Sequence, residues 1–433
     1  MVRNKKLVVV GAGSLQFGLG TVGSIFNSDV LKGSEVCLHD INEEALNLVR
    51  QGCLQAIEKN DYDYDLHATT DRQEALKNAD YVISAIEVGP RFKYWDQDQE
   101  IVRKYFPKQL FGENGGPGGM FHSLRVVPPI LEICEDIKKI CPNAFFINFS
   151  NPMSRICLSI KRKYPDLKFV GLCHEIAFAE RVLPKMMKTH LENIKITAGG
   201  LNHFGVILDA KYKDSGEDGY PAIRKRWSMI YNLLRIPSNL DLINYIFRTY
   251  GYLPYTQDSH YGEYIHWARE KADVAGVKLF KKAYKIFLSW NNKWTNRQIK
   301  RGRGYRVVKP DDERAIPIIE SMITDGKTSE NSVNVPNDGI ITNLPEDLVV
   351  ECPAIVDKDG IHGVKLGNYP KGLDALLRSQ ASVQDLVVEA ILSEKKTVAL
   401  KALLADPIVD DAEKAEKLLD EMIKLQSPHI KLQ

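Results

Sequence analysis

The sequence predicts an α/β protein: a Rossmann-like, doubly wound parallel sheet followed by a mixed α+β region. In the first part of the chain, short β-branched runs alternate with helical patterns, which is typical of a parallel sheet covered by helices on both faces. After about residue 195 the pattern changes to longer helices and an aromatic-rich stretch. We therefore expect a cofactor-binding region over residues 1–195 and a substrate-binding and oligomerisation region over residues 196–433, in one compact unit.

The expected parallel strands are short apolar runs at residues 7–10, 35–39, 81–86, 145–149 and 169–172. Between them, apolar residues recur at helical spacing and predict crossover helices. These helices cover residues 43–58 and 130–140. In the second region we expect helices within 224–248 and 373–425, the latter interrupted at Asp406-Pro407, and strands over 333–340 and 348–355.

Composition excludes several classes of protein. The net charge of the 433 residues is +2 with both signs interspersed, so nothing favours nucleic acid as a partner. No window approaches the ~18 apolar residues of a membrane-spanning helix. Seven cysteines lie at irregular spacing without a Cys-x-x-Cys pair, which favours reduced thiols and a cytoplasmic protein.

A glycine turn predicts the cofactor. Gly11-Ala12-Gly13-Ser14 follows the first strand, and Asp40 ends the second. Glycines let the backbone approach a pyrophosphate, the following helix N-terminus favours its charge, and the carboxylate accepts from ribose hydroxyls. The usual third glycine is replaced by Gln16, with Gly18 two residues later. The pattern predicts NAD bound at Gly11, Gly13, Ser14 and Asp40, and the acid favours NAD over NADP.

Four further segments carry polar or glycine-rich motifs: residues 115–120, Asn148 to Met153, Cys173-His174-Glu175, and Asn202-His203-Phe204. Singly, each has a structural explanation: a turn, a helix start, a buried thiol and a core imidazole. Ligands of open α/β sheets bind beyond the carboxyl ends of the strands, where two of these segments would emerge. We therefore expect a shared cleft.

Together these motifs, in this order and spacing, resemble glycoside hydrolase family 4, the NAD-dependent glycosidases. The resemblance covers most of the chain and includes Leu124-Arg125, Glu263-Tyr264 and Val333-Asn334-Val335-Pro336-Asn337. It implies a glycoside hydrolase that depends on NAD and manganese, with Cys173 and His203 as protein ligands of Mn²⁺. Two protein ligands would leave positions open for sugar hydroxyls and water.

The resemblance also implies a mechanism. NAD oxidises C3 of the sugar, a base removes the C2 proton, the C1 substituent leaves, water adds and the hydride returns. Tyr264 is the preferred base, followed by Asp258, and Glu113 is the candidate acid. Sugar-binding candidates are Asn148, Asn151, His174, Asn202, Arg91 and Arg125.

The substrate is expected to be an unphosphorylated α-glycoside. Family members acting on 6-phosphorylated sugars generally carry Asp directly after the metal-binding Cys, where this chain has His174. Glu175 resembles the branch acting on α-uronides, either an α-glucuronidase or an α-galacturonidase, for which Arg301, Arg303 and Arg306 are carboxylate-binding candidates. The alternatives are an α-galactosidase or α-glucosidase of the same family, or a metal-free NAD-dependent 2-hydroxy-acid dehydrogenase. The resemblance also implies a homodimer or homotetramer.

Overall fold

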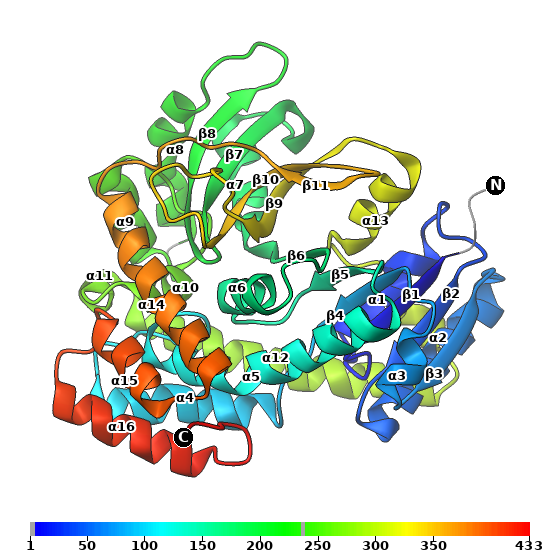
Figure 1. Cartoon of the computed structure of the whole chain (residues 1–433). Coiled ribbons are helices and arrows are strands. Elements are labelled where there is room, and N and C mark those ends of the chain that lie inside the picture. Colours follow the sequence, from blue (N-terminus) through cyan, green and yellow to red (C-terminus); the bar gives the residue numbers. More distant parts are fainter. Residues whose placement is uncertain (1–4, 235–238) are drawn as a thin grey trace.

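The computed structural model describes residues 5–234 and 239–433. One eleven-stranded sheet crosses the molecule in the order β3-β2-β1-β4-β5-β6-β9-β10-β7-β8, with β11 beside β10 (Figure 1). The strands are β1 (Lys6–Val10), β2 (Glu35–His39), β3 (Asp65–Thr69), β4 (Tyr81–Ser84), β5 (Phe145–Asn148), β6 (Phe169–Gly171), β7 (Ile194–Leu201), β8 (Phe204–Tyr212), β9 (Thr328–Pro336), β10 (Val349–Asp357) and β11 (Gly360–Gly363).

The first six strands pair in parallel and confirm the expected Rossmann-like fold. Their order, 3-2-1-4-5-6, is that of dinucleotide-binding sheets, in which the crevice opens where the strand order reverses. Here the reversal lies between β1 and β4, and Val10 pairs with both His39 and Ser84. Helices of this part are α1 (Phe17–Phe26), α2 (Glu43–Asn60), α3 (Arg72–Leu76), α4 (Arg91–Tyr105), α5 (Gly116–Ile140), α6 (Met153–Lys163) and α7 (Ala177–Met187).

The remaining strands extend the same sheet by antiparallel pairing. β9 joins β6 at Asn334 and Gly171, and β10 pairs with β9, β11 and β7. Residues 333–336 of the first expected strand lie in β9 and residues 349–355 of the second lie in β10, whereas residues 337–340 form a turn after β9. The division of the chain at residue 195 stays a prediction, although the sheet runs across that point without a break.

Both faces of the parallel sheet are buried. Leu7 and Val9 of β1 belong to one apolar cluster, while Val8 and Val10 belong to another, because successive side chains of a strand point to opposite faces. The second cluster includes α5 and the C-terminal helices α14 (Leu373–Ser393), α15 (Lys396–Ala405) and α16 (Ala412–Leu425). The end of the chain thus packs back onto the cofactor region.

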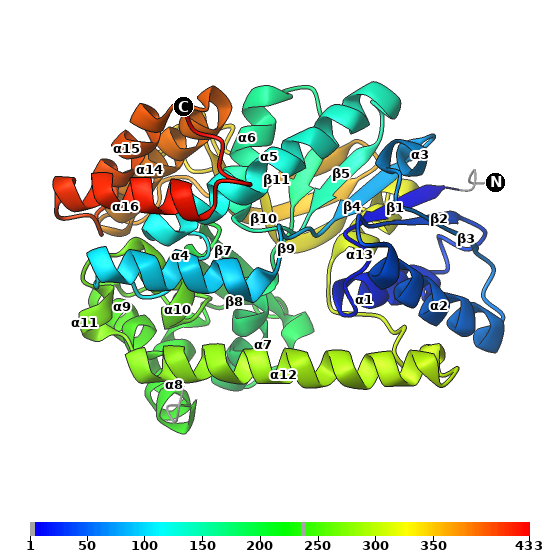
Figure 2. The same ribbon diagram turned by 90° about the horizontal axis from the view of Figure 1, so that it is seen from below.

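The helical pattern expected within 224–248 forms two helices, α8 (Tyr220–Leu234) and α9 (Asp241–Tyr250). The following segment contains α10 (Asp258–Tyr261), the 3-10 helix η3 (Gly262–Tyr264) and α11 (Ala268–Lys271); α13 (Ala315–Thr324) precedes β9. The long helix α12 (Val274–Lys300) runs across one side of the molecule, from near α11 to α2 (Figure 2). Among the described residues, no helix is long and apolar enough to cross a membrane.

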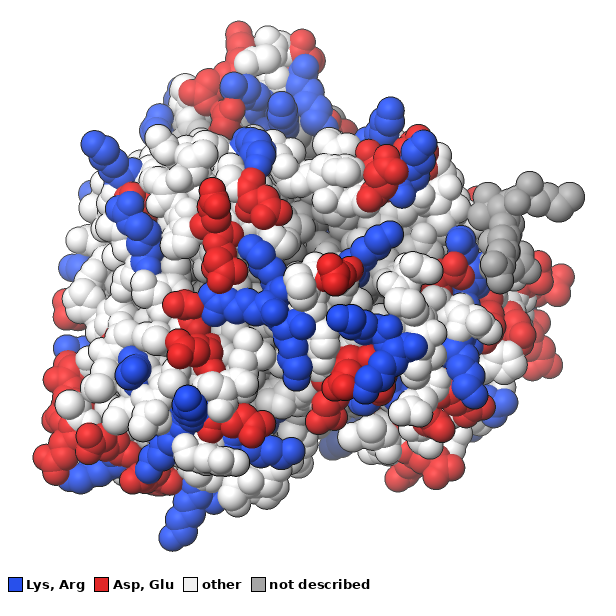
Figure 3. All heavy atoms as spheres, viewed as in Figure 1, with Lys and Arg blue, Asp and Glu red and all other residues white. Residues whose placement is uncertain are grey.

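Charges of both signs are interspersed over the face seen in Figure 3, as the small net charge suggests. The glycine-rich segment expected to be a turn is instead the first turn of α5, with Gly115 as its N-cap and Pro117 in its first turn. Proline is favoured there because these N–H groups have no partner within the helix.

Candidate active site

The turn after β1 lines a cavity of about 820 Å³. Gly11 has a φ of +81°, and a Cβ on it would lie 2.2 Å from the carbonyl oxygen of Ala85. The N–H of Gly13 donates to Oδ2 of Asp40 at 2.8 Å. Gly11, Ser14 and Asp40 all line the cavity, so the structure brings the four expected NAD-binding residues together.

Gly18 takes the packing role of the missing third glycine. A Cβ on Gly18 would lie 2.1 Å from the carbonyl oxygen of Ala12, so only glycine lets α1 approach the turn this closely. The N-terminus of α1 starts at Phe17, which also lines the cavity. A cradle with no space for side chains beside a helix N-terminus fits the pyrophosphate of NAD.

Cys173 and His203 meet although thirty positions separate them. Cys173 follows β6, and His203 lies in the turn between β7 and β8 with a φ of +133°. Sγ of Cys173 lies 3.2 Å from Nε2 of His203, close enough for both atoms to bind one ion. Nδ2 of Asn114 lies 3.0 Å from the other ring nitrogen and fixes the imidazole.

Two further donors converge here that the sequence analysis did not assign to a metal. Glu175, His203 and His260 offer ligand atoms within 4.8 Å of one another. Sulfur, imidazole and carboxylate donors beside a cavity fit a divalent metal. The signal for Glu175 was its place in the Cys-His-Glu motif, and the signal for His260 was its place in the segment of base candidates.

Burial and neighbouring charges together set the protonation states of these side chains. Burial and the charge of His260 lower the pKa of His203 to about 3, which keeps its imidazole neutral and able to bind a metal. Burial acts against ionisation of Glu175, but the charge of His260 and a hydrogen bond from Thr256 lower its pKa to about 2. Burial raises the pKa of the Cys173 thiol, so metal binding must displace its proton.

Glu263 holds the loop that carries Glu113. Its carboxylate accepts from the backbone N–H groups of Glu113, Asn114 and Gly115 at 3.1, 2.7 and 2.7 Å. The carboxylate of Glu113 lies 3.3 Å from Nδ2 of Asn151 and 3.8 Å from Nε2 of His260. Glu113 and Asn151 also line the cavity beside the glycine turn, so the cofactor cavity reaches the metal-ligand candidates.

Tyr264 is buried next to the candidate metal ligands. Its hydroxyl donates to the carbonyl oxygen of Asn202 at 2.9 Å, one residue before His203, and its ring stacks on Phe204. A Cβ on Gly115 would lie 2.6 Å from this ring, so the glycine is needed for the close approach. Burial raises the pKa of the Tyr264 phenol well above its usual value.

Asp258, the second candidate base, is held by backbone amides. Its two carboxylate oxygens accept from the N–H groups of Ile243 and Asp273, each at 3.0 Å. These bonds join the starts of α9 and α12. The arrangement fits a structural role.

Arg155 is a functional candidate that the sequence analysis missed. It is 1% exposed, donates to Oγ of Ser123 at 3.1 Å, and leaves Nε and Nη2 without a hydrogen-bond partner among the described residues. Its positive charge opposes the rise in the pKa of Tyr264. The available signal was an arginine within the apolar start of α6.

The structure separates the expected sugar-binding asparagines. Oδ1 of Asn151 and Oδ1 of Asn202 are buried with no hydrogen-bond partner among the described residues. Asn148 instead bonds to Ser150 and Met153, and so holds its own turn. Free acceptors at Asn151 and Asn202 suit sugar hydroxyls.

Two of the charged sugar-binding candidates are already paired with carboxylates. The guanidinium of Arg125 is fully buried in an ion pair with Asp98 at 2.7 Å. His174 is exposed and pairs with Glu313 at 3.2 Å, a bond that raises its pKa to about 9. Arg91 begins α4, but its side chain lies outside the described residues. A second cavity, of about 1160 Å³, is lined by Cys173 and His174. Arg301, Arg303 and Arg306 line neither this cavity nor the cofactor cavity, and lie at the end of α12 near α2.

A dinucleotide cradle that opens onto a cluster of Cys, His and carboxylate side chains defines an NAD-binding metalloenzyme. The family model described as family 4 glycosyl hydrolase matches residues 6–189, and the model of its C-terminal domain matches residues 198–409. The chain belongs to glycoside hydrolase family 4 and is a glycoside hydrolase. The expected dependence on NAD and manganese is confirmed.

Relatives span the whole chain. An "Alpha-glucosidase" of Erwinia rhapontici is 41% identical, covering 98% of this chain and 98% of its own. An "Alpha-galacturonidase" of Bacillus subtilis is 27% identical and covers 97% of each chain. A solved 6-phospho-beta glucosidase from Thermotoga maritima with manganese, NAD⁺ and glucose-6-phosphate is 26% identical, has a TM-score of 0.79 and covers 99% of this chain and 100% of its own.

Proposed function

We propose that the enzyme is an α-glucosidase that cleaves unphosphorylated α-glucosides. The observation that carries this proposal is the contact between Cys173 and His203, together with the free acceptor atoms of Asn151 and Asn202. The 41% identical relative is named an α-glucosidase. A metal site and a cofactor cradle that share one cleft suit oxidation and elimination rather than hydrolysis by two carboxylates.

Electrostatics favours a neutral sugar over the α-uronide suggested by the third residue of Cys-His-Glu. Glu175 is ionised at neutral pH and would repel a uronate. The arginines of residues 301–306 line neither cavity beside the cluster. These arginines are therefore not placed to supply the cation that a buried carboxylate substrate needs.

When bound, NAD would supply reversible hydride transfer at the sugar, and a divalent metal would stabilise the negative charge that develops on it. Cys173 and His203 hold the metal, with Glu175 and His260 nearby. Tyr264 removes the C2 proton, and the charge of Arg155 favours its phenolate. Glu113, close to His260, donates a proton to the leaving oxygen. We assign no role in proton transfer to Asp258.

Solvent exchange at C2 tests this function. Product formed in heavy water should carry deuterium at C2, measured by NMR, because deprotonation precedes the addition of water. Tyr264→Phe should lose the exchange and keep NAD binding. The matched control is Tyr261→Phe, which removes another buried hydroxyl from the same segment and should retain exchange. Glycoside cleavage without any C2 exchange in the parent enzyme contradicts the proposed mechanism.

A substrate panel separates the candidates. We expect p-nitrophenyl α-glucoside to be cleaved faster than the α-galactoside, the α-glucuronide and the α-galacturonide, with catalytic NAD and added manganese. A chelator should abolish turnover and manganese with a thiol reductant should restore it. A dehydrogenase would instead accumulate NADH in proportion to product. Preference for a uronide would overturn the assignment of the sugar but leave the C2 exchange result intact.

We further propose a cytoplasmic homo-oligomer, either a dimer or a tetramer. All seven cysteines are free, as in a reducing compartment. Helix α12 exposes large apolar side chains that recur at helical spacing, at Leu279, Ile286, Phe287, Trp290 and Trp294. An exposed apolar stripe of this kind favours burial against a second copy.

A further inference from the structure

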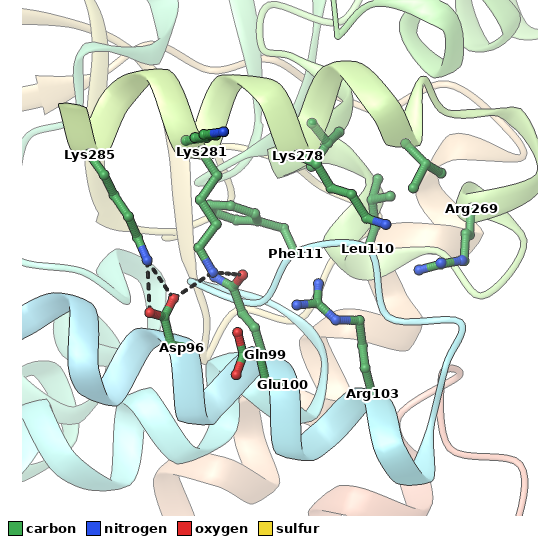
Figure 4. Close-up of a pocket in the computed structure, with 13 residues that line it drawn as sticks. Asp96, Gln99, Glu100, Arg103, Leu110, Phe111, Arg269, Lys278, Lys281 and Lys285 are labelled. Atoms are coloured by element: carbon green, nitrogen blue, oxygen red, sulfur yellow. Dashed lines mark hydrogen bonds and ion pairs between the residues drawn. The ribbon is translucent and has the colours of Figure 1, made fainter. Parts of the chain in front are cut away.

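We propose that a pocket between α4 and α12 binds a small organic phosphate, separately from the active site. The pocket has a volume of about 360 Å³, within the range of small-molecule sites. Six basic and two acidic side chains line it (Figure 4). The basic ones are Arg103, Arg269, Lys278, Lys281, Lys282 and Lys285; the acidic ones are Asp96 and Glu100.

Only part of this positive charge is neutralised. Lys281 and Lys285 both pair with Asp96, at 2.9 and 2.8 Å. Arg103, Arg269 and Lys278 have no recorded acceptor within the described residues, and their charged ends converge on the open space in Figure 4. An anion with two negative charges would compensate this cluster and accept several charge-assisted hydrogen bonds.

The two arginines also act on each other. Arg103 is half-buried, and burial together with the charge of Arg269 lowers its pKa, while Glu100 and Asp96 oppose this effect. Like charges held this close are unfavourable unless an anion lies between them. Guanidinium groups bind phosphate oxygens in a bidentate manner, so the pair suits a phosphate better than a single carboxylate.

The floor of the pocket is apolar. It contains Leu110 and Phe111, and Val274 and Val277 of α12 complete it. The ring of Phe111 stacks on His260 with centroids 5.6 Å apart, so it separates this pocket from the metal-ligand cluster. A ligand with a phosphate at one end and an apolar or ring-shaped body at the other matches these surfaces.

The apolar stripe of α12 and the basic side chains of the pocket lie on different sides of the helix. Lys278, Lys281 and Lys285 recur on one side of the helix, whereas Ile286 and Trp290 recur about 125° away at 100° per residue. A second copy seated on the stripe therefore leaves the basic side uncovered.

Calorimetry with phenyl phosphate tests the site. The full chain is saturated with NAD to occupy its pyrophosphate site, and divalent metal is omitted because it would bind phosphate. We expect one equivalent to bind, phenol not to bind, and Arg103→Gln and Lys278→Gln each to weaken binding about tenfold or more. The matched control, Lys293→Gln, removes an exposed lysine elsewhere on α12 and should change affinity less than about twofold.

Three results would overturn the proposal. The first is no binding by the parent protein. The second is equal affinity in the parent and in both pocket variants, which would place the ligand elsewhere. The third adds to the first: the parent protein does not bind phenyl phosphate, and the pocket variants differ from it in oligomeric mass. That result would assign the basic cluster to contact between copies. Since Lys278 is exposed, its replacement leaves folding intact and keeps the test decisive.

Discussion

Asp40 is held in place before any cofactor arrives. Its carboxylate accepts from the N–H groups of Gly13 and Asn42, both at 2.8 Å. We expect Asp40→Ala to weaken NAD binding roughly tenfold, since one charge-assisted hydrogen bond to the ribose is lost. Calorimetry measures the change, with the exposed Asp63→Ala as control. Unchanged affinity in Asp40→Ala would remove this residue from the site.

At the same scale, we expect the charge of Arg155 to set the pH at which Tyr264, the proposed base, acts. A positive charge favours the phenolate and so lowers the phenol pKa; replacing Arg155 by Met should raise that pKa. The rise of kcat with pH should then move to higher pH by about one unit. Arg155→Lys, which keeps the charge, should move the profile much less. A profile that stays in place in Arg155→Met would exclude an electrostatic role.

At the scale of elements, Asp258 joins two helices. Its carboxylate accepts from N–H groups at the starts of α9 and α12. Asp258→Ala should lower the free energy of unfolding by about 3 kcal/mol, because buried hydrogen bonds to a charged group contribute about 1.5–3 kcal/mol each. Denaturant unfolding measures the loss. The folded variant should still exchange deuterium at C2 of the sugar; loss of exchange alone, without loss of stability, would make Asp258 the base.

Elements also show where local pattern was sufficient. The strands over residues 7–10 and 35–39 were predicted to within a residue. Both faces of this sheet are buried, so its strands consist largely of consecutive apolar residues. The segment 115–120 was expected to be a turn from its glycines, yet it starts α5. Gly115 is needed because the ring of Tyr264 lies against it, a contact between segments far apart in the sequence.

For the whole molecule, the apolar stripe of α12 predicts the assembly. We expect a dimer or tetramer in sedimentation velocity, and a smaller species when Ile286→Glu and Trp290→Glu are combined, because buried charges oppose association. Leu425→Glu, at a comparably exposed apolar position on α16, is the control. A monomeric parent, or an unchanged mass in the double variant, would contradict an interface on this helix.

The sequence by itself determined five of the six parallel strands, the glycine turn with Asp40, and the residue types of the proposed metal pair; β3 was not predicted. These features depend on periodicity and on neighbours along the chain. The family followed from the order of the motifs, which is also a property of the chain alone.

Only the tertiary structure decided which polar atoms are free. The side-chain oxygens of Asn151 and Asn202 have no hydrogen-bond partner among the described residues, whereas Arg125 forms an ion pair with Asp98. Asp258 accepts from backbone amides, and the charge of Arg155 acts on Tyr264. The physical reason is that a polar group's function depends on whether packing has already satisfied its hydrogen bonds and charge, and the partners come from segments distant in sequence.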